Sequence, residues 1–172
     1  ASPDGTSRNY QFFAQAPGIG SSPTDAINDF IGLECTFGPA TQVFHVGKSA
    51  VALPLMLPGL MKLHEDQGAL GWNSLVNPAI EIAAQGILLS EQMAGIFEIL
   101  EPILKHSTPT KALFAPGGRM LGPGERFSSP DLPVFLSQLG TGNLGEIYGN
   151  LLSHFGSPAG LLQPGDLQRQ AI

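Results

Sequence analysis

The chain has 172 residues and a formal net charge of −6, and only 13% of its residues are charged, against about 25% in a typical soluble domain. This length suffices for one domain with a sizeable core, and so few charges predict a surface that is largely covered, most simply by another chain. The eight Lys and Arg residues form no basic run, and no apolar run approaches the ~20 residues of a membrane helix, so the composition argues against nucleic-acid and membrane partners.

The N-terminal region predicts a turn followed by an extended strand. Residues 3–5 (PDG) are a turn sequence, and residues 10–16 (YQFFAQA) predict a strand. Native proteins rarely leave an edge strand unpaired, so we expect a partner strand from upstream of the chain. Residues 25–30 predict a short helix, whereas residues 32–46 mix apolar and polar side chains around a Gly-Pro break and predict no single element.

The middle of the chain predicts one short strand and three helices. Residues 48–53 predict a buried strand, and residues 58–66 predict a helix that Gly68 closes in the left-handed conformation. Residues 73–86 predict a second helix, capped by its initial Asn and ended by its final Gly. Residues 90–104 predict a third helix. Its initial Ser is a cap, and the next residue places an acidic side chain in the first turn.

The C-terminal part predicts a loop and further helices. Residues 111–124 predict a loop with a short strand pair, and a helix is expected to begin at Ser128 or Ser129, with proline in its first position. Residues 144–155 predict another helix. Residues 165–168 carry a helix start with little sequence after it, so we expect both ends of the chain to be interrupted segments of a larger fold.

A series of short motifs follows the order found in one enzyme family. They are Gln11 to Pro17, Ala50 to Leu53, Gly59-Leu60, His64-Glu65 through Gly68, Leu70 and Trp72, Pro78 to Ile80, Ala83 to Gly86, Gly122 to Glu125, Pro130 to Leu132, Ile147 to Gly149, and Gly160 to Leu162 through Asp166-Leu167. Each motif alone is weak, but together they cover nearly the whole chain without reordering. The chain resembles the large subunit of the γ-glutamyltranspeptidase family of N-terminal nucleophile hydrolases.

The resemblance implies an α+β fold, namely the helix-rich portion of a four-layer αββα N-terminal nucleophile hydrolase. Residues 1–172 are expected to be a single segment, an internal part of the large subunit that other chains complete. The expected partners are a small subunit bearing an N-terminal Thr nucleophile, produced by autoprocessing, and a further large-subunit fragment. This chain would then hold no catalytic residue, since Ala1 has neither hydroxyl nor thiol. The expected substrate is a small-molecule amide, without a cofactor.

The resemblance also implies a substrate-pocket wall at Phe12, Phe13 and Ala14, and here the sequence departs from the family. In the family an Arg of this motif holds the α-carboxylate of the γ-glutamyl group, because a guanidinium binds a carboxylate through two parallel hydrogen bonds. Phe13 occupies that position, and Ala14 stands where the family has Glu. We therefore expect an amidohydrolase or acylase with a less charged acyl group. Structural packing is the alternative interpretation of these phenylalanines.

Other patterns predict structure rather than chemistry. The four histidines lack metal-ligand spacing and Cys35 is alone, so we expect no metal site. We expect His64 to be structural, and residues 117–119 (GGR) to be a plain loop. A non-catalytic helical binding or scaffold domain remains the alternative function. The first ten residues have no signal-peptide pattern, and the chain fits the cytoplasm or the periplasm equally.

Overall fold

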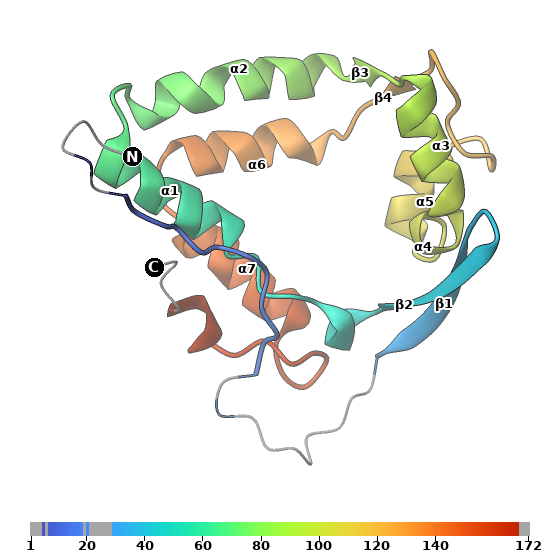
Figure 1. Cartoon of the computed structure of the whole chain (residues 1–172), viewed down its shortest axis with the longest axis horizontal. Helices are drawn as coiled ribbons and strands as arrows, with labels where there is room; N and C mark the ends of the chain where they lie inside the picture. Colours follow the sequence, from blue (N-terminus) through green and yellow to red (C-terminus); the bar gives the residue numbers. More distant parts are fainter. Residues whose placement is uncertain (1–4, 6, 19, 21–28, 169–172) are drawn as a thin grey trace. The chain divides into compact units, whose positions relative to one another are not determined.

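A computed structural model describes residues 5, 7–18, 20 and 29–168 and divides the chain into two compact units (Figure 1). The first unit comprises residues 1–29, 48–72 and 142–172, and the second comprises residues 30–47 and 73–141. Both contain helices, and the second also contains two small antiparallel sheets. The architecture is therefore α+β, as predicted. None of the helices in the described ranges is long and apolar enough to span a bilayer.

In its described residues the first unit contains two helices and two single 3-10 turns. Its elements are η1 (Lys48–Ala50), α1 (Met56–Gln67), α7 (Gly145–Phe155) and η2 (Asp166–Gln168). Buried Leu53, Leu55 and Leu162 form its core, and Phe12, Leu151, Leu152, Phe155 and Leu167 pack around them. The core thus joins the N-terminal segment to residues that follow α7, far away in the sequence.

The second unit begins with a β-hairpin. Strands β1 (Ile31–Phe37) and β2 (Ala40–Val46) pair antiparallel over all seven residues. The two-residue connection fits a type II′ turn: Gly38 has φ +61°, and the ring of the following proline fixes φ near about −65°. Helices α3 (Glu91–Ile99) and α4 (Glu101–Leu104) contact β1, and Cys35 on this strand is buried.

Helices and a second, minimal sheet complete this unit. They are α2 (Trp72–Gln85, whose first residue belongs to the first unit), β3 (Ile87–Leu88), α5 (Thr108–Phe114), β4 (Arg126–Phe127) and α6 (Asp131–Gly140). Strand β3 pairs with β4, and the rings of Phe97, Phe114 and Phe127 lie with centroids 5.0–5.7 Å apart. Helices α2 and α6 lie side by side (Figure 1) where Gly140 approaches Val76.

Several predicted helices and caps are confirmed. Helices α1, α2, α6 and α7 lie within a few residues of their predicted ranges. The Ser90 hydroxyl accepts a hydrogen bond from the Met93 N–H at 3.2 Å, which is the predicted cap. Gly86 ends α2 with φ +69°. A Cβ there would lie 2.7 Å from the Phe127 carbonyl oxygen, so both conformation and space require glycine.

Other predictions are wrong in detail. Residues 10–16 form no continuous strand, since only Gln15 pairs, in a single bridge with Leu53. Residues 48–53 contain η1 and that bridge rather than a strand. Gly68 is extended, with φ −70° and ψ 134°, rather than left-handed, and its N–H bonds to the His64 carbonyl. Within residues 90–104 the helix breaks at Leu100.

The loop and turn predictions had mixed outcomes. Helix α5 occupies the start of the loop predicted at 111–124, while the strand pair expected there is made by β3 and β4 instead. The predicted helix start at 165–168 is the 3-10 turn η2. The predicted turn at residues 3–5 and helix at 25–30 fall mainly outside the described residues.

Candidate functional site

The predicted pocket residues lie on an extended stretch of the first unit, residues 10–18, which we call the Phe13 segment. The Tyr10 hydroxyl donates a hydrogen bond to Asp66 Oδ2 at 2.9 Å. The Leu53 N–H donates to the Gln15 carbonyl at 2.7 Å, and the Gly18 N–H donates to Asp166 Oδ2 at 2.7 Å. Anchors at its start, middle and end therefore hold a segment that has no helix or strand of its own.

The three predicted residues face different surroundings. Phe12 packs against the core of the first unit, and a Cβ built on Gly59 of α1 would lie only 2.2 Å from Phe12 Cβ. Phe13 is 90% exposed and Ala14 is also exposed. Successive side chains of extended backbone point in opposite directions, which explains why one phenylalanine is packed and its neighbour is not.

A charged cluster on α1 holds the start of the segment. Asp66 Oδ1 accepts from Lys62 Nζ at 2.9 Å, and Asp66 Oδ2 lies 3.3 Å from Arg8 Nη1. The hydrogen bonds from Lys62 and Tyr10 lower the pKa of Asp66 from its ordinary value, although partial burial opposes them. Arg8, the cation nearest to Phe13 along the sequence, is thus already paired with a carboxylate.

Asp166 holds the other end, and sequence reasoning missed this role. Its side chain is 0% exposed, and Oδ2 accepts the N–H of Gly18 and, at 2.9 Å, that of Gln163. The sequence signal was a Gly-Asp-Leu triplet that predicts the start of a helix. An aspartate at such a start binds backbone N–H groups, but nothing in the sequence indicates that one of them comes from residue 18.

His64 has a structural role in this region, as expected. Its Nε2 lies 2.7 Å from the Leu70 carbonyl oxygen, and its ring meets Trp72 edge-on at 5.1 Å between centroids. A Cβ on Gly68 would lie 2.5 Å from the imidazole Cδ2. The histidine therefore holds the turn that follows α1, within the first unit. Among the described residues no three His, Cys, Asp or Glu side chains form a group suited to a metal ion.

The Gly-Gly-Arg sequence at 117–119 belongs to a loop closed by an ion pair. The Arg119 guanidinium contacts both carboxylate oxygens of Glu125 at 2.6 and 2.7 Å, and the Gly122 N–H donates to Glu125 Oε2 at 2.7 Å. The hydrogen bond from Arg119, and to a smaller extent the one from the Gly122 N–H, lower the pKa of Glu125 from 4.5 to about 2. The arginine is thus bound within its own loop.

This ion pair makes the loop sensitive to acid. The folded pKa of Glu125 lies below its unfolded value, so its stabilisation is fully present above about pH 4.5 and is lost as the pH falls toward 2. We expect hydrogen exchange of residues 115–125, at rates corrected for pH, to accelerate between pH 4.5 and 2.5. Glu125→Gln should show the faster exchange already at pH 7.

The control for that experiment is Glu98→Gln on α3. No ion pair among the described residues involves its side chain, and the change removes the same charge from the same unit. Equal acceleration of the loop in both variants would contradict the role assigned to Glu125.

Comparisons with known proteins give the chain its relatives. A family model described as gamma-glutamyltranspeptidase matches residues 11–169. The human protein glutathione hydrolase 7 is 33% identical over 104 residues, which are 59% of this chain and 15% of that protein. The chain therefore spans a small part of this curated relative.

Solved structures of the same family are also similar. Gamma-glutamyltranspeptidase from Pseudomonas nitroreducens, solved in complex with L-DON, aligns with a TM-score of 0.61 at 26% identity over 72% of this chain and 38% of its own. The Helicobacter pylori enzyme aligns at 0.64 and 21% identity, over 70% of this chain and 36% of its own. The transpeptidase CapD of Bacillus anthracis aligns at 0.59 and 16% identity, over 84% of this chain and 52% of its own. At 21% and 16% identity, the last two establish similarity of fold alone.

The sequence resemblance, the family match and the fold agree. They favour an enzyme class of hydrolases and transferases over an unrelated binding domain. This chain belongs to the gamma-glutamyltranspeptidase family.

Proposed function

We propose that this chain is an internal, non-nucleophilic segment of the large subunit of a γ-glutamyltranspeptidase-like amidohydrolase or acylase. The observation that carries the proposal is the family match over residues 11–169 in a chain that spans only 38% of its solved relative from Pseudomonas nitroreducens. A polypeptide of that extent needs other chain segments to complete a four-layer αββα fold, and residues 1–172 act as one piece of it.

Exposed apolar side chains support such a partner. Phe13, Met56, Leu70, Ile82 and Val134 all remain at least half exposed. Large exposed apolar area is characteristic of surfaces that another chain covers. The proposed partners are a small subunit whose first residue is the nucleophilic Thr, and a further fragment of the large subunit.

The proposed reaction takes place on that Thr. Its hydroxyl attacks the amide carbonyl while its own α-amino group accepts the proton, and the amine leaves as an acyl-enzyme forms. Water then attacks the acyl-enzyme and releases the acid. The present chain contributes no group to these bond changes. Its role is to form part of the wall that receives the acyl group, at Phe12, Phe13 and Ala14.

The proposed acyl group has no charged substituent at the position where a γ-glutamyl group carries its carboxylate. Phe13 offers an apolar ring where the family motif has Arg, and Arg8 is engaged by Asp66. Loss of a buried partner for a charged group costs about 2–5 kcal/mol of binding, so γ-glutamyl donors are proposed to be poor substrates.

The test of the proposed class is isolation of the native complex. We expect intact-mass analysis and N-terminal sequencing to find a companion polypeptide that begins with Thr, and we expect the complex to hydrolyse simple acyl amides. Amide hydrolysis by this chain alone, or a native chain with no companion, would overturn the proposal.

The acyl preference has its own test in the assembled enzyme. Phe13→Arg restores a cation at the motif position and should raise kcat/KM for a γ-glutamyl anilide about tenfold relative to a neutral acyl anilide, because one charged hydrogen bond is worth about 1.5–3 kcal/mol. The control is Phe37→Arg at the end of β1, which introduces the same charge in place of another exposed phenylalanine. An unchanged preference in Phe13→Arg would remove Phe13 from the acyl site.

A further inference from the structure

The Phe13 segment is fixed at both ends by carboxylates from distant parts of the chain. Asp66 lies 56 residues from Tyr10, and Asp166 lies 148 residues from Gly18. Both contacts lie within the first unit. The nine-residue segment between them therefore depends on tertiary contacts for its path.

Between these anchors Phe13 is the one large apolar side chain that is exposed. Phe12 packs against Gly59 and the core, and Gln15 is tied to Leu53, whereas Phe13 between them is 90% exposed. Because the backbone on both sides is already fixed, only the side-chain torsions of this ring become ordered when it meets a ligand. Its position is decided by the anchors rather than by contacts of its own.

The two anchors differ in what their removal would do. Asp166 is fully buried and binds backbone N–H groups, so its loss disturbs the core. Asp66 is partly exposed, and Oδ2 holds the segment through the Tyr10 hydroxyl, while Lys62 occupies Oδ1 and so directs Oδ2 toward the tyrosine. The Asp66 anchor can therefore be removed without opening the core.

We propose that Asp66 is a positioning residue for acyl-group binding, acting through the Tyr10 hydroxyl to fix the backbone that carries Phe13. This inference rests on the proposed function, because it takes Phe13 as part of the acyl site. The inference goes beyond the proposed function, because it assigns the orientation of the Phe13 side of the acyl site to a carboxylate on α1 that does not touch the substrate.

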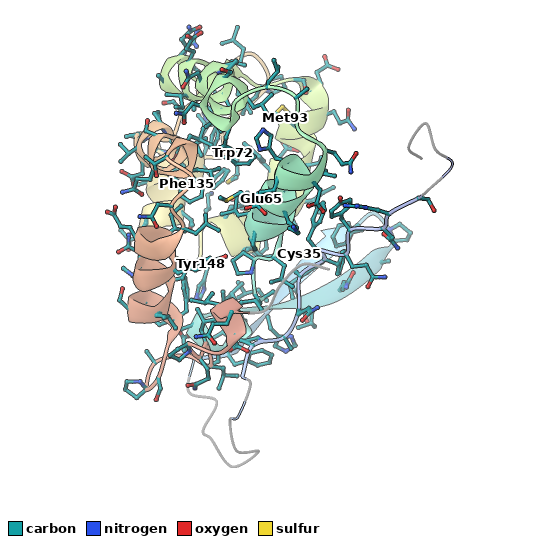
Figure 2. All side chains as sticks on the ribbon, turned by 90° about the vertical axis from the view of Figure 1, so that its left-hand side faces the viewer. Cys35, Glu65, Trp72, Met93, Phe135 and Tyr148 are labelled. Carbon is teal, nitrogen blue, oxygen red and sulfur yellow. The ribbon has the colours of Figure 1, made fainter. Side chains whose placement is uncertain are left out.

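The experiment replaces Tyr10 by Phe in the assembled enzyme and uses a neutral arylacyl anilide as the probe. We expect KM to rise about threefold, the effect of one lost hydrogen bond, with kcat unchanged because the Thr on the partner chain is untouched. Hydrogen exchange of residues 11–16 should accelerate in the same variant. The matched control is Tyr148→Phe on α7 (Figure 2), the other tyrosine of the sequence, which should change neither.

Two substitutions at Asp66 separate positioning from general stability. Asp66→Asn keeps an oxygen that accepts from Tyr10 and should retain a KM near the original, whereas Asp66→Ala should match Tyr10→Phe. The double variant Asp66→Ala with Tyr10→Phe should be no worse than either alone, since both remove one contact.

The failures of the two proposals are distinguishable. If Phe13→Ala raises KM but Tyr10→Phe and Asp66→Ala do not, the positioning role is wrong and the acyl site stands. If Phe13→Ala has no effect on KM, the acyl site itself is wrong, and the inference falls with it.

Discussion

Replacing Asp166 by Ala is expected to destabilise the first unit by about 2–6 kcal/mol, because two partly buried N–H donors lose their shared acceptor at about 1–3 kcal/mol each. Those donors are the N–H groups of Gly18 and Gln163, at 2.7 and 2.9 Å from Oδ2. The side chain is 0% exposed, so bulk water does not reach its oxygens in the folded unit. Asp166→Asn keeps one acceptor oxygen and should cost less, about 1–2 kcal/mol.

Hydrogen exchange measured by mass spectrometry suits this prediction, since it reports the opening free energy of each unit separately. We expect faster exchange in α7 and in residues 10–18, with the β1–β2 hairpin unaffected. Asp131→Ala in the exposed first turn of α6 is the control, with an expected cost of about 0.5 kcal/mol. Equal effects of the two aspartates would show that burial of Asp166 contributes nothing.

Local patterns were sufficient to predict most helices but not the hairpin. Helices can be predicted from periodic apolar positions and from caps, and Ser90 before α3 is an example of such a cap. The hairpin at 31–46 carries a usable signal, a Gly-Pro pair between two seven-residue runs, but such a pair alone predicts only a break in the chain. A glycine followed by proline also supplies the two φ values of a type II′ turn.

The anchors of the Phe13 segment could not be predicted, for a different reason. Residues 10–16 have the composition of a strand, yet a strand needs a partner along its length and the described residues supply only Leu53. What fixes the segment instead is a pair of side chains, Asp66 and Asp166. Each of them reaches the segment only when the chain has folded, Asp66 at Tyr10 and Asp166 at Gly18. The role of Phe12, Phe13 and Ala14 as a pocket wall stays a prediction, and nothing in the sequence indicates what holds the segment that carries them.

Gly59→Ala is expected to destabilise the first unit by about 2–3 kcal/mol, the upper part of the range of about 1–3 kcal/mol for an overpacked core. The added Cβ would lie 2.2 Å from Phe12 Cβ and 2.3 Å from its Cγ. These atoms are at the root of the side chain, so no rotation of the ring relieves the contact, and the backbone of the Phe13 segment must move. We expect faster hydrogen exchange in residues 10–18 together with a lower unfolding free energy of that unit.

The matched control is Gly95→Ala, the same substitution inside helix α3. A Cβ on Gly95 would meet nothing within 4 Å, so the variant should gain about 0.5–1 kcal/mol from the higher helix propensity of alanine. If Gly59→Ala lowers the unfolding free energy and Gly95→Ala raises it, the glycine of α1 is needed to leave space for Phe12. The path of the Phe13 segment is then set by contact with this helix. A stabilising Gly59→Ala would mean that the segment does not lie against α1, and the candidate acyl site would lose its support there.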